Sequence, residues 1–442
     1  MRIQLSDHFT FNRLLRFTIP SIIMMLCTSV YSIIDGLFVS NYVGKVPFAA
    51  LNLMMPFLMA LGTVGFMIGT GGSAVVAITL GEGKKEKANE YFSMFIYVAV
   101  ILGIILGAIG IIFMRPIAIA LGATDELLGY SVIYGRIIAA VIPAFMLQYI
   151  FQSFFVTAEN PGLSLKVSIG AGLTNVVFDF LFIVVFKWGI AGAALATAMG
   201  QMVGGVVPII YFLNKNSGIL RLGKTKFYGK VLLKACINGC SELMTNISAS
   251  IVNILYNLQL MKLSGEDGVA AYGVIMYANF VFAAVYIGYS IGTAPIVGYH
   301  YGAENESELK NLFWKSLTLI GIAGICMVVL AELLSYSLTK LFVGYDAELF
   351  ALTCHGFRLY AISFLICGFN IWGSGFFTAL GDGITSAIIS FLRTLVFQVA
   401  VVLILPMYLQ IDGIWLAIVV AEVLALFVTG TFLVKKRKKY HY

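Results

Sequence analysis

Charge is the scarcest feature of this sequence. Only 11% of its 442 residues are charged, whereas about a quarter of the residues in a soluble domain are. Hydrophobic residues make up 60% of the chain, and its mean hydropathy is +0.96. A soluble globular fold is therefore excluded. Several charge-free stretches exceed the roughly 20 residues that cross a bilayer as a helix, namely 51–80, 91–114, 188–214 and 269–299.

Other absences narrow the fold and the chemistry. Apolar residues run continuously instead of alternating, which excludes the strands of a membrane barrel. The four histidines are scattered, and the six cysteines lie mostly in apolar stretches without further ligands nearby. We therefore expect no metal site and no cofactor. No cluster of nucleophile, base and metal qualifies as a catalytic centre, so we do not expect an enzyme.

The chain matches itself when it is shifted by 221 residues, half of its length. Gly44 then falls on Gly265 and Gly81 on Gly302, and one register serves from the first apolar segment to the last. Such a run indicates two copies of one unit. Charges and glycines divide the chain into twelve spans, six in each copy. An even number of spans makes the copies parallel repeats, related by a pseudo-twofold axis along the membrane normal.

We therefore predict an all-α integral membrane protein with twelve transmembrane helices. Residues 1–214 form an N-lobe, residues 215–234 a basic linker, and residues 235–442 a C-lobe. About 20 of the 28 Lys and Arg lie on the side of the two termini, which places both termini in the cytoplasm of a cell membrane protein. The net charge of +7 mainly reflects this orientation, so lipid is the expected surrounding and nucleic acid is not an expected partner.

One nucleotide-binding motif is present but lies in the wrong context. Residues 218–225 match the phosphate-loop pattern G-x-x-x-x-G-K-[ST]. That loop must follow a buried strand and open a helix, whereas this segment follows a membrane span within the basic linker. We expect no nucleotide binding.

Ionisable residues within the spans are few. Each is costly in lipid unless it faces a partner or a cavity, so each is a functional candidate. Glu332 and Glu422 are expected near the interfaces or in structural ion pairs. The full set is Asp35, Arg136, Asp179, Glu242, Glu332, Arg358, Arg393 and Glu422.

The N-terminal half holds the sharper polar cluster. Asn175 and Asp179 are spaced i and i+4 on one predicted helix, and Thr197 and Gln201 repeat that spacing on the next. If these faces converge on Asp35 in the first span, two carboxylates share a pocket with an amide and a hydroxyl. Burial and mutual repulsion suit such acids to carry protons, and the same oxygens could hold Na⁺. The alternative is that both acids only bond neighbouring helices.

Proline and glycine add two features to these helices. Pro20 lacks a backbone N–H, so the first span can kink or straighten near it. Gly200 and Gly204 have the spacing that lets membrane helices approach closely.

Taken together, these residues resemble the MATE (multidrug and toxic compound extrusion) family. Pro20 and Asp35 have the spacing of the family's bending proline and essential aspartate, and Asn175, Asp179 and Thr197 have that of its N-lobe polar site. Each half also carries a similar run after its second span, Gly-Thr-Gly-Gly-Ser-Ala from 69 and Ile-Gly-Thr-Ala-Pro-Ile from 291. The resemblance implies a two-lobed antiporter that exports cationic amphipathic compounds in exchange for H⁺ or Na⁺.

The resemblance also makes Glu242 a secondary cation candidate, because some members use an acidic residue there. The tenth span carries Arg358 and no carboxylate between 350 and 378, so a complete C-lobe cation site is not expected. Flexible Met and aromatic side chains suit a surface for varied cations, although they also serve as ordinary packing residues. The cavity candidates are Gln148, Met54, Met55, Met59, Met199, Met202, Tyr256 and Met276.

Other transporter classes fit less well. Major-facilitator carriers have an Asp-Arg-rich motif after the second span, and residues 81–87 lack it. A channel would need repeated filter loops. A lipid-linked oligosaccharide flippase of related architecture stays open as the alternative, because Arg136, Arg358 and Arg393 could meet an anionic headgroup. We expect the protein to act as a monomer.

Overall fold

Long apolar segments become helices in this chain because lipid offers no partner for backbone N–H and C=O groups. The computed structural model describes residues 3–214 and 218–442. Residues 215–217, the start of the predicted linker, lie outside the described residues, as do residues 1–2. The elements are α1 (Phe11–Tyr42), α2 (Lys45–Gly81), α3 (Lys85–Ala120), α4 (Asp125–Ala140), α5 (Ile142–Thr157), α6 (Pro161–Asp179), the π-helix η1 (Phe180–Val185), α7 (Gly189–Leu213), α8 (Gly229–Gly302), α9 (Glu306–Val343), α10 (Ala347–Ala361), α11 (Phe364–Ala379), α12 (Gly383–Phe391), the π-helix η2 (Leu392–Val396), α13 (Phe397–Ile404) and α14 (Pro406–Tyr440).

Twelve spans emerge from these elements once the bends are considered. In the described parts of the chain, nine helices are long and apolar enough to cross a membrane, and two bent pairs, α4 with α5 and α10 with α11, bring the number to eleven. The 74 residues of α8 would extend about 110 Å as one helix, far beyond the roughly 30 Å of a bilayer core. Gly265 breaks it with φ 61° and ψ −147°, so α8 supplies two spans. The predicted all-α fold with twelve spans is confirmed.

The duplication is also visible in the backbone. The bent pairs break at Val141 and Ile362, which are 221 residues apart, with bends of 56° and 48°. Positive φ angles recur at the same offset in three places: Gly44 and Gly265, Gly83 and Glu304, and Gly189 and Gln410. The two halves therefore share bends and turns as well as residues, which is what parallel repeats require.

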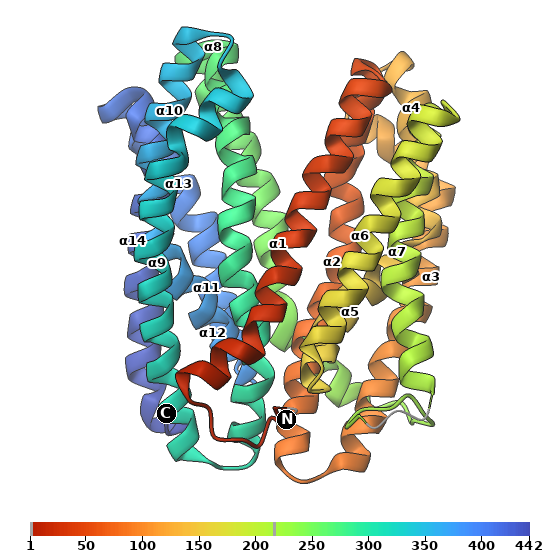
Figure 1. The fold of residues 1–442 in the computed structure, drawn as a ribbon, viewed down its shortest axis with the longest axis vertical. Coiled ribbons are helices and arrows are strands. Elements are labelled where there is room, and N and C mark those ends of the chain that lie inside the picture. Colours follow the sequence, from red (N-terminus) through yellow and green to blue (C-terminus); the bar gives the residue numbers. More distant parts are fainter. Residues whose placement is uncertain (1–2, 215–217) are drawn as a thin grey trace.

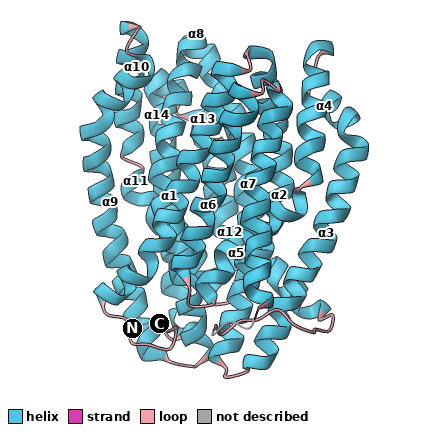
Figure 2. Cartoon of the chain, turned by 45° about the vertical axis from the view of Figure 1, so that its right-hand side comes forward, coloured by secondary structure: helices cyan, strands magenta, loops and turns pink. Residues whose placement is uncertain are grey.

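The helices form two bundles that meet at one end. Figure 1 shows α1–α7 and α8–α14 lying together at the end that carries both termini and diverging toward the opposite end. We call these the terminal end and the splayed end. In the turned view of Figure 2 the helices run along the long axis, and loops gather at its two ends.

Glycines bring the bundles together at the terminal end. The helix α2 packs more extensively against α8 than against any other element. A Cβ added at Gly81 would lie 2.0 Å from the Tyr299 carbonyl oxygen, and one added at Gly302 would lie 2.1 Å from that of Ile78. Both glycines and both carbonyl residues are related by the offset of 221, so these are two symmetry-related copies of one contact. Backbone touches backbone there, which no larger residue permits.

The linker lies against the N-terminal bundle. Helix α8 begins at Gly229, inside the range predicted for the linker. Upstream of it, Asn89 of α3 accepts a hydrogen bond from the Arg221 N–H at 2.6 Å, and Ser93 accepts one from the Gly223 N–H at 3.0 Å. Residues 220–228 have no helix or strand, so the phosphate-loop-like segment lacks the context that motif needs.

Candidate functional site

Three helices bring the predicted polar residues together in the N-terminal bundle. Asp35 of α1 is 7% exposed and Asp179 of α6 is fully buried. The Asp35 carboxyl group interacts with the side chains of both Asp179 and Asn175. The Asn175 amide in turn donates to the Thr197 hydroxyl of α7 at 3.5 Å. The sequence spacing therefore placed the right faces together. We call Asp35 and Asp179 the acid pair.

The acid pair is unusually poor in hydrogen-bond donors. Within the described residues, Oδ1 of Asp35 and both Oδ atoms of Asp179 are buried without a hydrogen-bond partner, as are Asn175 Oδ1 and Gln201 Oε1. Buried polar oxygens normally have a partner. Two ionised carboxylates cannot hydrogen-bond each other, so their contact becomes a hydrogen bond only when they share a proton. The site is a cluster of oxygens suited to accept a proton or a small cation.

Small residues allow the three helices to approach this closely. A Cβ added at Gly200 would lie 3.0 Å from the Asn175 Cβ, and one added at Gly172 would lie 2.8 Å from the Tyr31 ring. A Cβ at Gly204 would lie 2.7 Å from Cγ of Gln148. The close packing predicted for Gly200 and Gly204 is therefore confirmed. Because α7 has glycines here instead of larger side chains, α6 packs close to it and Asn175 comes within hydrogen-bonding distance of Thr197.

The backbone changes at the acid pair. Asp179 is the last residue of α6, and the π-helix η1 follows it directly. Single-turn π-helical segments shift the side chains that follow and are frequent at functional sites. In the other bundle, the π-helix η2 carries Arg393. In both lobes, a buried charged residue thus lies at or beside a π-helical turn.

Sequence reasoning missed two tyrosines near the acid pair. Tyr134 of α4 is 1% exposed and lies within electrostatic range of both Asp35 and Asp179. Tyr31 lies one turn before Asp35 on α1, and its hydroxyl accepts a hydrogen bond from Gln148 at 3.5 Å. The sequence alone does not distinguish a functional tyrosine in an apolar span from one that only packs. The one available signal is that Tyr31 lies four residues before Asp35 and so shares a helical face with it.

Pro20 lies inside the continuous helix α1, between two contacts with α8. Cβ atoms added at Gly292 and Gly288 would lie 3.0 Å from Thr18 Cβ and 2.5 Å from Ile22 Cα. The first half of α1 is thus pressed against the C-terminal bundle. Its second half carries Asp35 to the N-terminal bundle, so α1 connects the two.

The C-lobe candidate Glu242 lies in different surroundings. It is half-buried on α8, and the nearby charge that acts on it is that of Arg393. Arg393 itself donates from Nε to both carboxylate oxygens of Glu422, at 2.9 and 3.0 Å. Arg358 pairs with Glu332 at 3.7 Å. The structural pairing predicted for Glu332 and Glu422 is confirmed.

The cavity candidates are dispersed. Met199 and Met202 lie on the exposed face of α7 with Leu195 and Ile210, away from the acid pair. Met54 is buried in the core of the N-terminal bundle, and Met55 packs against that core.

The remaining cavity candidates also lie apart from one another. Tyr256 stacks on Tyr272 at 5.0 Å in the C-terminal bundle, against whose core Met276 packs. Met59 accepts a contact from the Tyr149 hydroxyl at 4.0 Å. Gln148 is connected to the acid pair through Tyr31, which interacts with Asp35.

Comparison with known proteins agrees with this architecture. The chain is 24% identical to the multidrug export protein MepA of Staphylococcus saprophyticus over 414 residues, 93% of this chain and 91% of that protein. It is 23% identical to MepA of Staphylococcus haemolyticus over 419 residues, 94% of this chain and 92% of that protein.

Solved structures show the same fold. A crystal structure of MATE in complex with MaL6 has a TM-score of 0.93 at 21% identity and covers 98% of both chains. The outward-facing conformation of a multidrug resistance MATE family transporter has a TM-score of 0.90 at 22% identity and covers 98% of this chain and 97% of that chain. The MatE family model matches residues 20–181 and again 243–404, once in each repeat. The chain belongs to the MatE family of multidrug efflux transporters.

Proposed function

We propose that the protein is a cation-coupled antiporter that exports cationic amphipathic compounds by alternating access. The observation that carries this proposal is the acid pair, where buried carboxylates from two helices meet and three of their four oxygens have no hydrogen-bond partner among the described residues. Such oxygens can bind a coupling cation in one state of the cycle and be ionised and unoccupied in the other. Asp35, Asp179, Asn175 and Thr197 form the coupling site, with H⁺ or Na⁺ as the coupling ion. Each chain carries both lobes, so one chain suffices for the cycle.

The orientation follows from the distribution of Lys and Arg. With the termini in the bacterial cytoplasm, the splayed end faces outward. Asp35 lies seven residues before the end of α1, about 10 Å from the splayed end at 1.5 Å per residue. A cation from outside therefore has a short path to the acid pair.

Neutralising the acid pair removes a repulsion that the low dielectric of the bundle makes strong. Loss of that repulsion lets α1 and α6 approach, and Pro20 allows α1 to bend because no N–H is present there to hold the helix straight. The bound compound is then released outward. Return to the other state requires the acid pair to lose its cation on the cytoplasmic side.

The arginines argue against the flippase alternative. Arg393 is paired with Glu422, and Arg358 with Glu332. Arg136 donates to the neutral Ile111 carbonyl oxygen at 3.3 Å, which does not balance its charge, so only Arg358 and Arg393 count against a headgroup site. An anionic headgroup would need basic side chains whose charge is not already balanced. MepA proteins are named for multidrug export, which agrees with a drug as the substrate and not a lipid-linked sugar.

The test is ethidium efflux from proteoliposomes, with a pH gradient and a Na⁺ gradient imposed separately. The wild type should export ethidium under one of these gradients. Asp35→Asn and Asp179→Asn should each reduce driven efflux to the level of empty liposomes and leave the melting temperature nearly unchanged, since each variant keeps one side-chain oxygen and its amide can replace an oxygen without a hydrogen-bond partner.

Glu332→Gln is the matched control, because it removes an acid that lies on α9, in the other bundle, and is paired with Arg358. It should retain efflux. Full driven efflux by Asp35→Asn would refute the coupling role. Efflux under neither gradient, together with binding of polyprenyl-linked sugars, would favour the flippase.

A further inference from the structure

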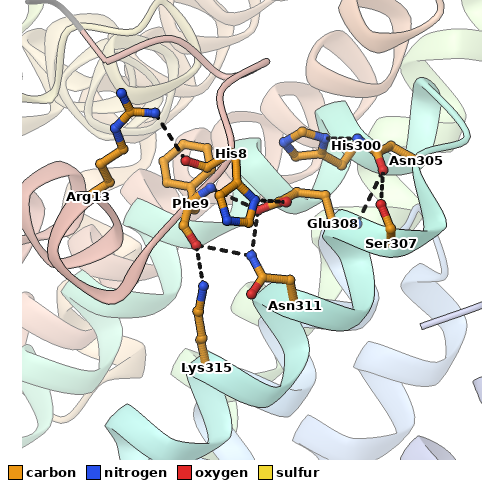
Figure 3. Close-up of polar contacts among 9 residues, drawn as sticks. All are labelled: His8, Phe9, Arg13, His300, Asn305, Ser307, Glu308, Asn311 and Lys315. Carbon is orange, nitrogen blue, oxygen red and sulfur yellow. Dashed lines mark hydrogen bonds and ion pairs between the residues drawn. The ribbon is translucent and has the colours of Figure 1, made fainter.

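The segment that precedes α1 is buried at the terminal end. Leu5 and Phe9 are both fully inaccessible to solvent, although neither belongs to a helix or strand. Figure 3 shows His8 and Phe9 lying against the start of α9, with the side chains of Glu308, Asn311 and Lys315 pointing toward them. We call residues 3–10 the N-terminal clasp.

One side of the clasp is fixed to the C-lobe. The Glu308 carboxylate accepts the Phe9 N–H at 2.9 Å and lies 2.6 Å from Nδ1 of His8. The Phe9 carbonyl oxygen accepts hydrogen bonds from Lys315 at 2.7 Å and from Asn311 at 3.0 Å. Both backbone groups of Phe9 are thus bonded to charged or amide side chains of α9. Hydrogen bonds to charged groups are stronger than neutral ones.

The other side of the clasp is fixed to the N-lobe. The Leu5 N–H donates to Oε1 of Glu159 at 2.8 Å. Glu159 lies in the turn between α5 and α6, is 8% exposed and has a φ of 59°. A positive φ is uncommon for a residue with a side chain, so the turn holds this carboxylate in a defined place. Residues 3–10 therefore bond both lobes within one short segment.

The linker makes the corresponding crossing in the other half. It precedes the first C-lobe helix and lies on α3 of the N-lobe, where Asn89 and Ser93 hold it. The clasp precedes the first N-lobe helix and lies on α9, the element that corresponds to α3 after a shift of 221 residues. Connectivity alone forces the linker to cross between lobes. The crossing of the clasp depends on the contacts of Phe9 and Leu5.

We propose that the N-terminal clasp locks the two lobes together at the terminal end and must release one of them before that end can open. This inference rests on the alternating access proposed above, in which the lobes separate there. Glu159 and Glu308 belong to different lobes, so the clasp cannot keep both carboxylates once the lobes part.

The clasp is also connected to Pro20 through α1. It continues directly into α1, whose N-cap is Thr10. Residues before Pro20 are therefore held to the C-lobe by Glu308, while Asp35, after Pro20, joins the acid pair of the N-lobe. A bend at Pro20 changes the distance between these two attachments, so the state of the acid pair can act on the clasp through one helix.

Hydrogen–deuterium exchange of the full chain in lipid nanodiscs tests the clasp without drug or ion gradient. Glu308→Ala and Glu159→Ala should each raise the exchange rate of amides at the terminal ends of α2 and α8 by about tenfold, the factor that corresponds to about 1.4 kcal/mol. Exchange near the acid pair should stay unchanged in both variants.

Two matched controls come from the start of α9 and the turn before it. Glu306→Ala removes an acid from the first turn of α9 that pairs only with Lys310 and His441 among the described residues. Glu304→Ala changes an exposed residue with a φ of 54°, which matches the backbone of Glu159. Both should exchange like the wild type.

The outcomes separate the clasp from a general loss of stability. Glu308→Gln keeps an oxygen for the Phe9 N–H and should restore much of the slow exchange, which a merely unfolded variant would not show. Faster exchange at the terminal end in only one of Glu159→Ala and Glu308→Ala would overturn the proposed clasp. So would control variants that raise the exchange rate as much as these two do. Because no transport is measured, an unexpected substrate or coupling ion would refute the proposed function and leave this result intact.

Discussion

At the scale of single residues, the two lobes differ in how their buried charged groups are hydrogen-bonded. Arg393 and Glu422 have side chains that are 16% and 2% exposed, and Asn370 donates to the same carboxylate at 2.7 Å. Every oxygen of Glu422 is therefore bonded. In the acid pair of the N-lobe, three of the four carboxylate oxygens have no hydrogen-bond partner among the described residues. A bonded buried ion pair holds structure, whereas unpartnered carboxylates are free to take up a cation.

Breaking the ion pair of Arg393 and Glu422 should therefore lower the stability of the fold rather than the coupling of transport to the cation. Glu422→Gln leaves the Arg393 guanidinium buried without its counter-charge, which should destabilise the fold by about 3–5 kcal/mol. The melting temperature in detergent should fall clearly. The double variant Arg393→Leu with Glu422→Leu should recover most of this loss, because neither partner is left as an unpaired charge.

Glu332→Gln gives the comparison at the surface. The pair of Arg358 and Glu332 is about half exposed, so its loss should change stability by no more than about 1 kcal/mol. Equal melting temperatures for Glu422→Gln and Glu332→Gln would contradict the structural role of Glu422.

At the scale of elements, α1 is the helix that both lobes share. Gly292 and Gly288 of α8 press on it at Thr18 and Ile22, on either side of Pro20. Farther along, the Tyr31 ring lies against Gly172 of α6. A helix fixed to two bodies must deform when they move, and the position without a backbone N–H is where it does so at least cost.

Pro20→Ala should therefore slow transport without harming the fold. Restoring the N–H removes a defect that costs about 3 kcal/mol in a helix interior, so the straight form of α1 is favoured. We expect an equal or higher melting temperature and a several-fold lower rate of gradient-driven ethidium efflux. An unchanged efflux rate in a well-folded Pro20→Ala variant would remove Pro20 as the hinge.

The elements also show what the sequence could predict. The spacing of Asn175 and Asp179 predicts that they share a face of α6, because i and i+4 residues do so in any helix, and the structure brings that face to Asp35 and Thr197. The π-helical turn after Asp179 and the break at Val141 have no such periodic signal. The bonds of Leu5 and Phe9 were also missed, since they join residues up to 306 positions apart, and only the packed lobes bring these together.

At the scale of the whole molecule, the duplication builds the contact that closes the terminal end. Gly81 meets Tyr299 and Gly302 meets Ile78 as two copies of one contact. The pseudo-twofold axis thus passes between α2 and α8, as in an isologous dimer interface. The N-terminal clasp adds a further contact between the lobes, which does not involve these two glycines. Closure at this end is therefore shared between a backbone contact within the bundles and an extended segment beside them.

This symmetry makes the two glycines equivalent in a substitution test. Gly81→Ala and Gly302→Ala each insert a Cβ into a backbone contact, which should destabilise the closed terminal end by about 1–3 kcal/mol. Gly170→Ala is the control, because no atom lies within 4 Å of the added Cβ. Hydrogen exchange at the terminal ends of α2 and α8 should rise in the first two variants and not in the third.

The double variant tests whether both glycines serve one interface. Once Gly81→Ala has separated the backbones, Gly302→Ala has less contact left to lose, so the combined effect on exchange should be smaller than the sum of the single effects. Fully additive effects would mean that each glycine packs independently. In that case the repeated contact would be a consequence of duplication alone, and the terminal end would be closed by the clasp and the α1 contacts instead.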